Sequence, residues 1–505
     1  MPELLARLDT RLSLLTSGRR DAPARQRTLR ATLDWSYGLL DAGEQRALAR
    51  VAVFAGGFSA EAAEIVCEVR LDEMAALVEQ SLVRRQEGRL ALLETIREYG
   101  LERLADRGEE RDLRARHADW CVSFSERASG ELWGPNQLAW LDRLELELDN
   151  LRAALAFLLE ARHVDSALRR TSSLWIFWEA RHPKEGLRAL EASLENRVGA
   201  DPGMSARAMH AAGQLLFFEG DMRRSRTHFE EAVRVFRELG DEPWLAVSLT
   251  RLSWVAIETK RADEQVRLAR EALAVLERVT EPWARAETLN YAGTALAVGG
   301  ERSHGRALLE QSRATYLAMG NDQPAEVLNN LGWVAMLEGD FTAARSYHLR
   351  NVEAARRVRD GSRLSHALGN LGLIEALAGD FEGARSFVLE NLTVQRDRGE
   401  QRNVAEALVV AAAILMSRSD HEGAGRMVGA SEAMHEFGGG SWNDLEHEVV
   451  DTHVLAAVTE GRAAALARAR AEGHALTIPE AIEFALKALE QASTGGPSGL
   501  QAPQA

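Results

Sequence analysis

Lysine is the residue that a phosphate-binding loop needs most, and this 505-residue chain has it only at Lys184, Lys260 and Lys487. A P-loop cradles phosphates with the backbone amides of a glycine-rich turn, and a lysine directly after a glycine reaches the β and γ oxygens. None of the three lysines follows a glycine. The chain therefore has no Walker A motif, and we expect it to bind no nucleotide cofactor by itself.

Three His-Glu pairs, at 421–422, 435–436 and 447–448, begin like the metal-binding motif of zinc proteases. That motif needs a second histidine three residues after the glutamate, so that both imidazoles reach one zinc ion. The residues at those positions are Gly425, Gly439 and Asp451. We therefore expect no metal site, and no other pattern singles out a catalytic residue.

Two glycine-rich stretches imitate other active-site loops. "GAGRMVG" at 423–429 has the spacing of a dinucleotide-binding loop, but no strand precedes it, so we interpret its small residues as helix packing. "GGGSW" at 438–442 contains the start of a nucleophile elbow, but Asn443 stands where the last glycine is required. We interpret this stretch as a loop that ends the regular part of the chain.

The elements that position these residues follow a repeat. "LEGDFTAARSYHL" at 337–349 returns as "LAGDFEGARSFVL" at 377–389, forty residues later. Equivalent positions recur at intervals of 39 or 40, at residues 220, 260, 300, 339, 379 and 419. A period of this length predicts a repeat architecture rather than one globular core.

Each repeat unit has the pattern of two helices. In one unit, an apolar run over 327–337 is followed by Gly339 and Asp340 and then by an amphipathic run over 341–358. Gly339 suits a left-handed helix end, and Asp340 suits the N-cap of the next helix. One pair cannot bury both of its apolar faces, so the pairs must stack into a superhelix. We expect Phe341 and Phe381 to seat equivalent second helices against their neighbours.

A set of small and apolar residues in these units resembles the tetratricopeptide repeat, lengthened to about 40 residues. One unit carries the set as Leu331, Gly332, Gly339 and Ala344, and another as Gly213, Gly220, Phe229 and Ala232. The resemblance implies a right-handed α-solenoid whose first helices line a concave groove.

Asparagine recurs at one position of three consecutive first helices, at Asn290, Asn330 and Asn370, while Trp254 and Trp333 share another position. In a tetratricopeptide groove, amides can hold an extended peptide backbone and aromatic rings can anchor apolar groups. These five residues are therefore the predicted binding site for a protein or peptide ligand. The alternative is that the asparagines join adjacent helix pairs and the tryptophans fill the stack.

The chain before the repeats has a different pattern. Asp41 and Glu44 form a capping box, and Ser59 suits the N-cap of the next helix. A helix over 71–81 is followed by strands over 82–86 and 89–93, with a turn at 87–88 between them. Helices followed by a two-stranded wing predict a winged-helix domain.

A winged helix that reads DNA presents basic and amide side chains to base edges and phosphates. The predicted recognition helix carries Asp72, Glu73 and Glu79 instead, while the basic residues of the wing are Arg84, Arg85 and Arg89. Repulsion between these carboxylates and phosphate disfavours direct DNA binding. The net charge of −15 likewise disfavours nucleic acid or an anionic membrane surface as an electrostatic partner.

Several phrases of this front part resemble bacterial signal-transduction ATPases of the NB-ARC or STAND type, found in large LuxR-type regulators. They are "RQRTLRATLDWSY", "VFAGGFSAEAAE" and "LLETIREYGLERL", with "WLDRLELELDNLRAAL" at 140–155 resembling the entry into the repeats. In that family a P-loop domain precedes a segment like "PELLARLDTRLSLLTSG", so the chain is expected to start where that domain would end. Leu92, Leu93 and Glu94 replace the family's Met-His-Asp nucleotide sensor.

Composition sets the remaining limits. With 46% hydrophobic and 27% charged residues, the chain is expected to fold, and with Cys67 and Cys121 as its only cysteines it has no disulfide framework. The first twenty residues lack the apolar segment of a secretion signal, and the longest apolar run, at 407–416, is about half a membrane span. We therefore expect a cytoplasmic bacterial protein.

The predicted fold is all-α with a small β wing: a winged helix followed by a tetratricopeptide-like right-handed α-solenoid. The expected parts are a lid remnant at 1–22, the winged helix at 23–110, a connecting helical segment at 111–142, repeats at 143–440, a helical cap at 441–492 and a tail at 493–505.

The resemblance implies a non-catalytic sensor and autoinhibitory arm of a STAND-type regulator, with a protein or small ligand in the solenoid. A nucleotide-binding domain on a separate chain is a second expected partner. The alternatives are a DNA-binding regulator that uses the winged helix, and part of a split NTPase.

Overall fold

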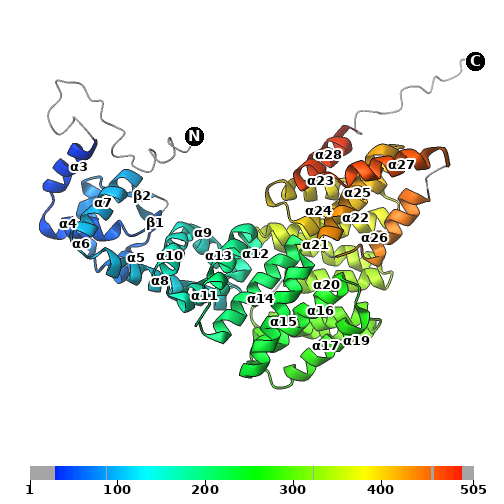
Figure 1. Cartoon of the computed structure of the whole chain (residues 1–505), viewed down its shortest axis with the longest axis horizontal. Coiled ribbons are helices and arrows are strands. Elements are labelled where there is room, and N and C mark those ends of the chain that lie inside the picture. Colours follow the sequence, from blue (N-terminus) through cyan, green and yellow to red (C-terminus); the bar gives the residue numbers. More distant parts are fainter. Residues whose placement is uncertain (1–28, 87, 322–323, 439, 457–459, 492–505) are drawn as a thin grey trace, which may run out of the picture. The chain divides into compact units, whose positions relative to one another are not determined.

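The computed structural model describes residues 29–86, 88–321, 324–438, 440–456 and 460–491 (Figure 1). Two compact units divide the chain: unit 1 consists of residues 1–128 and 142–170, and unit 2 consists of residues 129–141 and 171–505. The predicted lid remnant at 1–22 and the tail at 493–505 lie outside the described residues. None of the helices in the described ranges combines the length and apolar character that a membrane crossing requires.

Unit 1 contains helices and a small sheet, and its last helices continue into unit 2. Its elements are α3 Leu29–Gly38, α4 Ala42–Val51, β1 Gly57–Phe58, α5 Ala60–Cys67, α6 Leu71–Glu79, β2 Val83–Gln86, β3 Arg89–Leu92, α7 Glu94–Asp106, α8 Glu110–Glu131, α9 Gln137–Leu146, α10 Leu148–Glu160 and α11 Val164–Ser173.

The sheet of unit 1 is antiparallel with strand order β1-β3-β2. β2 and β3 pair from Val83 with Leu92 to Gln86 with Arg89, which confirms the predicted hairpin. The sequence did not predict β1, whose two residues pair with Ala91 and Leu90 and are too few to show alternation. The assignment of this unit as a winged-helix domain stays a prediction.

Local hydrogen bonds fix the helix starts of unit 1. Asp41 accepts from the amides of Gly43 and Glu44, and Glu44 accepts from the Asp41 amide, which confirms the predicted capping box. Ser59 accepts from the amide of Ala62, as predicted. Below these helices lies a buried core that contains Phe54 and Phe58, whose rings stack 4.7 Å apart.

Unit 2 consists of stacked helix pairs and a C-terminal cap (Figure 1). A leading pair, α12 Trp175–Arg181 and α13 Pro183–Glu195, contains Trp175 and Trp178, which are buried. The six pairs that follow are α14 Pro202–Glu219 with α15 Met222–Leu239, α16 Glu242–Glu258 with α17 Ala262–Leu276, α18 Pro282–Val298 with α19 Arg302–Ala318, α20 Ala325–Leu337 with α21 Phe341–Val358, α22 Gly361–Leu377 with α23 Phe381–Arg398, and α24 Gln401–Ser417 with α25 His421–Gly438.

The turn inside each of the six pairs contains one residue in the left-handed region. These residues are Gly220, Lys260, Gly300, Gly339, Gly379 and Ser419, and they occupy the predicted register. Where the turn is followed by aspartate, as at Asp221, Asp340 and Asp380, the carboxylate accepts from a backbone amide three residues later. The repeat period is thus set by one backbone conformation that recurs in each pair.

Small residues bring the two helices of a pair together. A methyl group at Gly332 would lie 2.6 Å from the His348 ring, and one at Gly213 would lie 3.1 Å from the Phe229 ring. Both glycines are buried on first helices, and both aromatic partners are buried on second helices. The paired helices therefore approach closely at both glycines.

The solenoid contacts itself across its own axis. α12 packs against α22, and α14 packs against α24. Arg398 at the end of α23 donates to the carbonyl oxygens of Glu179 at 2.9 Å and Ala180 at 3.2 Å. The first helices of early pairs, α12 and α14, therefore lie against the first helices of late pairs, α22 and α24.

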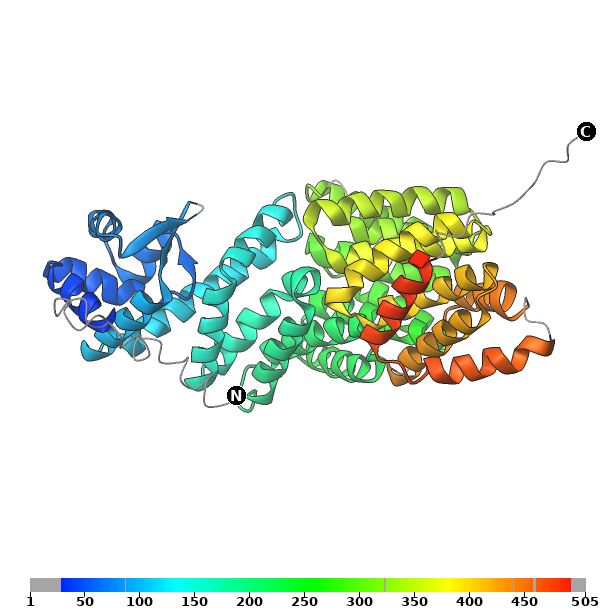
Figure 2. The ribbon, with the colours of Figure 1, turned by 90° about the horizontal axis from the view of Figure 1, so that it is seen from above.

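A cap follows the sixth pair, with α26 Asp444–Val449, a π-helical turn Val450–Leu455, α27 Glu460–Gly473 and α28 Ile478–Gln491. α28, red in Figure 2, packs against α23 and α24. The glycines of "GAGRMVG" lie in α25, where a methyl group at Gly425 or Gly429 would lie 2.8 or 1.9 Å from a backbone oxygen of α27. The helix-packing interpretation of this stretch is confirmed.

One packing expectation was wrong. Phe341 is 36% exposed, so it cannot seat α21 in the stack, whereas Phe381 is partly buried against the core. Phe341 is the first residue of its helix, and the contacts of α21 depend on buried residues further along, such as Ala344 and Val352. A large loss of stability on replacing Phe341 is therefore not expected.

Removal of a helix cap should have a small and local effect. Asp340→Ala deletes the acceptor for the Ala343 amide, 2.9 Å away, and should lower the free energy of unfolding by about 1 kcal/mol. Urea denaturation measures the change, and hydrogen exchange should show it mainly in α20 and α21, because solenoid stability is mainly a sum over neighbours. Equal loosening of unit 1 would contradict a stack of locally coupled pairs.

Replacement of a contact glycine should separate the cap from the repeats. Gly429→Ala places a methyl group against the Arg470 carbonyl and should cost about 1–3 kcal/mol. Gly130→Ala is the matched control, since Gly130 is helical and nothing lies within 4 Å of the added methyl group. The control should be neutral or stabilising by up to about 1 kcal/mol. Equal denaturation midpoints for both variants would show that the α25–α27 contact is not tight.

Candidate functional site

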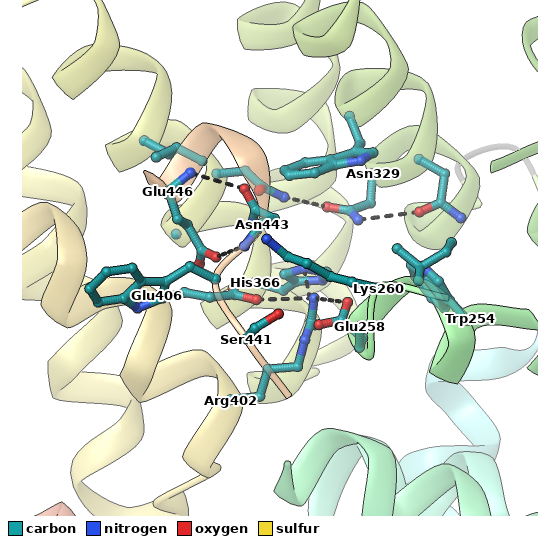
Figure 3. Close-up of a pocket in the computed structure, with 17 residues that line it drawn as sticks. Trp254, Glu258, Lys260, Asn329, His366, Arg402, Glu406, Ser441, Asn443 and Glu446 are labelled. Atoms are coloured by element: carbon teal, nitrogen blue, oxygen red, sulfur yellow. Dashed lines mark hydrogen bonds and ion pairs between the residues drawn. The ribbon is translucent and has the colours of Figure 1, made fainter. Parts of the chain in front are cut away.

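The inner face of unit 2 contains a cleft (Figure 3). Its walls come from the first helices α16, α20, α22 and α24, and from the segment Ser441–Glu446 between the repeats and the cap. Four of the five predicted site residues line it: Trp254, Asn330, Trp333 and Asn370. The fifth, Asn290, is buried and does not line the cleft.

The predicted asparagines form hydrogen bonds between neighbouring first helices. Asn330 Nδ2 donates to Asn290 Oδ1 at 2.9 Å, which joins α20 to α18. Asn370 Nδ2 donates to Asn329 Oδ1 at 3.1 Å, which joins α22 to α20. Asn290 and Asn330 are fully buried and Asn370 is 5% exposed, so two of the three have one face in the stack and one at the cleft. Asn329, which the sequence did not single out, links them.

Aromatic side chains form the apolar part of the wall. Trp254 is half-buried, stacks on Phe217 at 5.5 Å and meets Tyr291 edge to face at 4.6 Å. Trp333 is also half-buried and packs against the core of the later repeats. Trp442 belongs to the predicted loop "GGGSW", and its indole N–H donates to Ser431 Oγ at 2.9 Å. That bond holds the segment before α26 against the repeats.

A charged cluster lies at the centre of the cleft, and sequence reasoning did not find it. In Figure 3 the Arg402 guanidinium lies between the carboxylates of Glu258 and Glu406, at 3.1 and 3.0 Å. Its Nη1 also donates to the His366 ring at 3.4 Å. Glu406 stands four residues after Arg402 on one helix, which the sequence could have revealed, but Glu258 is 144 residues away.

Burial determines the ionisation of this cluster. It raises the pKa of Glu406 to about 7, although Arg402 opposes the shift. Burial and the nearby Glu406 charge raise the pKa of Glu446 well above its ordinary value. Burial and Arg402 together hold the pKa of His366 well below its usual range, so this ring is neutral and can accept from Arg402. The cleft thus combines one guanidinium with three carboxylates.

A second buried network connects the first helices elsewhere on the inner face. Arg251 and Glu287 form an ion pair whose side chains are 2% and 0% exposed, and the guanidinium lies 3.5 Å from the Tyr291 ring centre. Arg363 lies 3.3 Å from Glu179 and 3.5 Å from Glu326. These contacts join α12, α16, α18, α20 and α22. We interpret the network as part of the packing of the superhelix.

The charged side chains of unit 1 bear on the prediction that direct DNA binding is disfavoured. The wing residue Arg89 pairs with Glu147 at 2.6 Å and also donates to the Gly57 carbonyl, so its charge is committed within the unit. On the predicted recognition helix α6, Asp72 pairs with Arg70, which stands just before the helix. Arg84 and Arg85 are exposed. The acidic side chains of α6 remain its dominant charges.

Glu94, at the position of the family's sensor motif, begins α7 and pairs with Arg97 at 2.9 Å. It therefore acts as a carboxylate at a helix start, where the helix dipole favours it. In the part of the chain that the structure describes, no group of three or more His, Cys, Asp or Glu side chains lies close enough to hold a metal ion.

By sequence, this chain matches a repeat family and is similar to proteins that are named as regulators. The family model named "Tetratricopeptide repeat" matches residues 204–278 and 323–397. A candidate HTH-type transcriptional regulator of Mycobacterium tuberculosis, Rv0890c, is 32% identical over 331 residues, which are 62% of this chain and 37% of that protein. The regulatory protein AfsR of Streptomyces griseus is 27% identical over 194 residues, 36% of this chain and 20% of AfsR. The chain thus spans little more than a third of the mycobacterial relative.

Among solved structures, a STAND protein with a tetratricopeptide repeat sensor from Pyrococcus horikoshii aligns with 97% of this chain and 72% of its own length. The identity is 13% and the TM-score is 0.49, and likeness at this level carries no functional inference. The helix pairs, their register and the family match together identify unit 2 as a tetratricopeptide-like helical solenoid, preceded by helices with a small three-stranded sheet.

Proposed function

We propose that this chain is the sensor and autoinhibitory arm of a STAND-type transcriptional or signalling regulator, and that it is not an enzyme. Its solenoid binds a protein, peptide or small ligand in the inner cleft, and that binding changes how unit 1 engages a nucleotide-binding domain on another chain. The observation that carries the proposal is the cleft itself, because four of the five predicted residues converge on it from repeats far apart in sequence.

Three further observations support this role. Two relatives that match by sequence, Rv0890c and AfsR, carry regulator names, and this chain spans 37% and 20% of their lengths. The cleft is built by first helices from the second, fourth, fifth and sixth pairs, so a ligand there would contact both halves of the array. A ligand that contacts several helix pairs can favour one packing of the solenoid over another, since each pair is held mainly by its neighbours.

Direct DNA binding by unit 1 is the weaker alternative, although relatives are named as HTH-type regulators. The carboxylates of α6 would face phosphate, and Arg89 is held by Glu147. Salt-sensitive, sequence-selective binding of a duplex by the whole chain would favour that alternative over the sensor role.

The experiment starts from the partner that the whole chain recovers in a pull-down from a bacterial extract, followed by titration of that partner. Trp333→Ala removes a half-buried anchor from the cleft and should weaken binding at least about tenfold when titrated below its melting temperature, which the lost packing is expected to lower. Phe341→Ala is the matched control, because Phe341 is an exposed aromatic residue that does not line the cleft. Equal affinities of the two variants would contradict binding in the cleft.

The asparagines either hold a partner's backbone or join neighbouring helices, and substitutions distinguish these two roles. If the two asparagines that line the cleft hold a partner's backbone, replacing Asn330 and Asn370 together with alanine should weaken binding by roughly one to two orders of magnitude. Because Asn330 donates to the buried Asn290, which does not line the cleft, we also expect Asn330→Ala alone to lower stability by about 1–3 kcal/mol. A thermal melt beside each titration distinguishes the effects. A double variant that melts early but binds normally when folded would assign the asparagines to packing alone.

A further inference from the structure

Carboxyl groups outnumber cationic groups in the lining of the cleft. Glu258, Glu406 and Glu446 line it, and Arg402 is the guanidinium that lies among them. Lys260 also lines the cleft, but its side chain is 46% exposed and its ammonium lies 3.9 Å from Asp444, which is itself exposed. Within the described lining, carboxylates therefore outnumber the enclosed cations.

One of these carboxylates has an unused oxygen. Glu446 is 3% exposed, and its Oε2 accepts from the Asn443 amide at 2.7 Å. Its Oε1 is buried and has no hydrogen-bond partner. A buried oxygen without a partner costs free energy, so a site that keeps one is expected to fill it with a donor.

Arg402 does not donate to that oxygen. Its two Nη atoms are engaged with Glu258, Glu406 and His366, its Nε is buried without a partner, and the guanidinium lies 5.3 Å from the ring centre of Phe217. An anionic ligand would meet three carboxyl groups beside a guanidinium whose Nη atoms are already paired. A cationic ligand would meet the unpaired Oε1 of Glu446 instead.

The walls of the cleft suit an organic cation rather than a metal ion. Trp254 and Trp333 line it, and the electron-rich faces of tryptophan attract ammonium and guanidinium groups. Among the described residues, no set of carboxylates and imidazoles is close enough to coordinate a metal. Donors with several N–H groups can reach more than one carboxylate oxygen at once.

We propose that this cleft binds the ammonium or guanidinium group of an organic cation, held by Glu406 and Glu446 beside Trp254 and Trp333. The inference rests on the proposed function and names the chemical class of its ligand. The cation is carried either by a small amine or by a peptide, through an arginine or lysine side chain or the N-terminus. The charged group is what the cleft recognises in each case.

Binding should release protons, because burial raises the pKa of Glu406 to about 7 and also raises the pKa of Glu446 well above its ordinary value. The charged and titratable groups around them are Glu258 and Lys260 from α16, His366 from α22, Arg402 from α24, His435 from α25 and Asp444 from α26. Burial lowers the pKa of His435 to about 4, so this ring stays neutral. A bound cation favours ionised carboxylates, and affinity should therefore rise as pH increases from roughly 6 to 8.

The test is isothermal titration calorimetry on the whole chain with three probes. Agmatine carries a guanidinium and an ammonium group, acetyl-Ala-Arg-Ala-amide carries the guanidinium on a peptide, and the same peptide with citrulline in place of arginine is uncharged. Binding of agmatine alone supports a small amine, and binding of the arginine peptide supports a peptide. No binding of either at about 1 mM, or equal binding of the citrulline peptide, overturns the proposal.

Two readouts on the wild-type chain avoid any question of folding. Enthalpies measured in phosphate and in Tris should differ in the direction of proton release, and affinity should fall at least about threefold between pH 8 and pH 6. Constant affinity with no proton release overturns the proposal.

Charge-neutral variants locate the site. Glu446→Gln and Glu406→Gln keep the side-chain shape and should each weaken binding of the cation about tenfold or more. Glu390→Gln is the control, since Glu390 pairs with Arg356 on exposed second helices and does not line the cleft. Glu446→Gln should melt no earlier than the wild type, because burial raises the pKa of Glu446 and glutamine avoids the free-energy cost of that shift.

Cation binding that neither Glu446→Gln nor Glu406→Gln alters would place the cation elsewhere and overturn the proposal. Binding of the recovered partner to the same variants shows whether only the cationic ligand is refuted or the sensor role as well. A partner that is lost in Trp333→Ala but retained in Glu446→Gln would leave the sensor role standing and refute the cationic ligand.

Discussion

The constraint on which unit 2 depends is that no helix pair of this chain can bury both of its apolar faces alone. Each pair must therefore pack against the next, and a recurring left-handed residue at the turn keeps the pairs in the same orientation. The first helices then lie on the inner face, between two neighbours. Their buried polar side chains are shielded from water and form hydrogen bonds with adjacent first helices, as Asn330 does with Asn290.

The cleft follows from the same constraint. When the array contacts itself, with α14 against α24, side chains from distant repeats meet on the inner face. Arg402 pairs with Glu258 in this way, and the segment before α26 covers them, held by the bond from Trp442 to Ser431. Enclosure removes water, and this raises the pKa of Glu406 toward neutrality. Packing of the repeats thus produces a polar cleft in which one buried carboxylate oxygen, Oε1 of Glu446, has no hydrogen-bond partner.

Much of this could be predicted from the sequence, because the features concerned are local and periodic. The turn register was visible since a positive φ favours glycine, and it extended correctly to Lys260 and Ser419, where the residue type alone gives no such signal. The hairpin and the caps of unit 1 were also found. Phe341 was misjudged because the repeat shows where a residue lies along a helix but not how deeply that end of the helix is covered.

The charged centre of the site could not be predicted. Arg402 and Glu258 belong to repeats that meet only after the array closes, and no periodicity links an arginine in one pair to a glutamate four pairs earlier. The contact of α27 with the glycines of α25 has the same character, since the sequence predicted close packing but not its partner. Closure of a superhelix depends on small rotations that accumulate over every pair.

Hydrogen exchange of the whole chain, with and without the partner recovered from a bacterial extract, tests most directly whether the inner face is the binding surface. The account predicts that the partner slows exchange in α16, α20 and α22 and in the segment Ser441–Glu446. Slower exchange confined to second helices such as α15, α17 and α19, with the inner face unchanged, would contradict it.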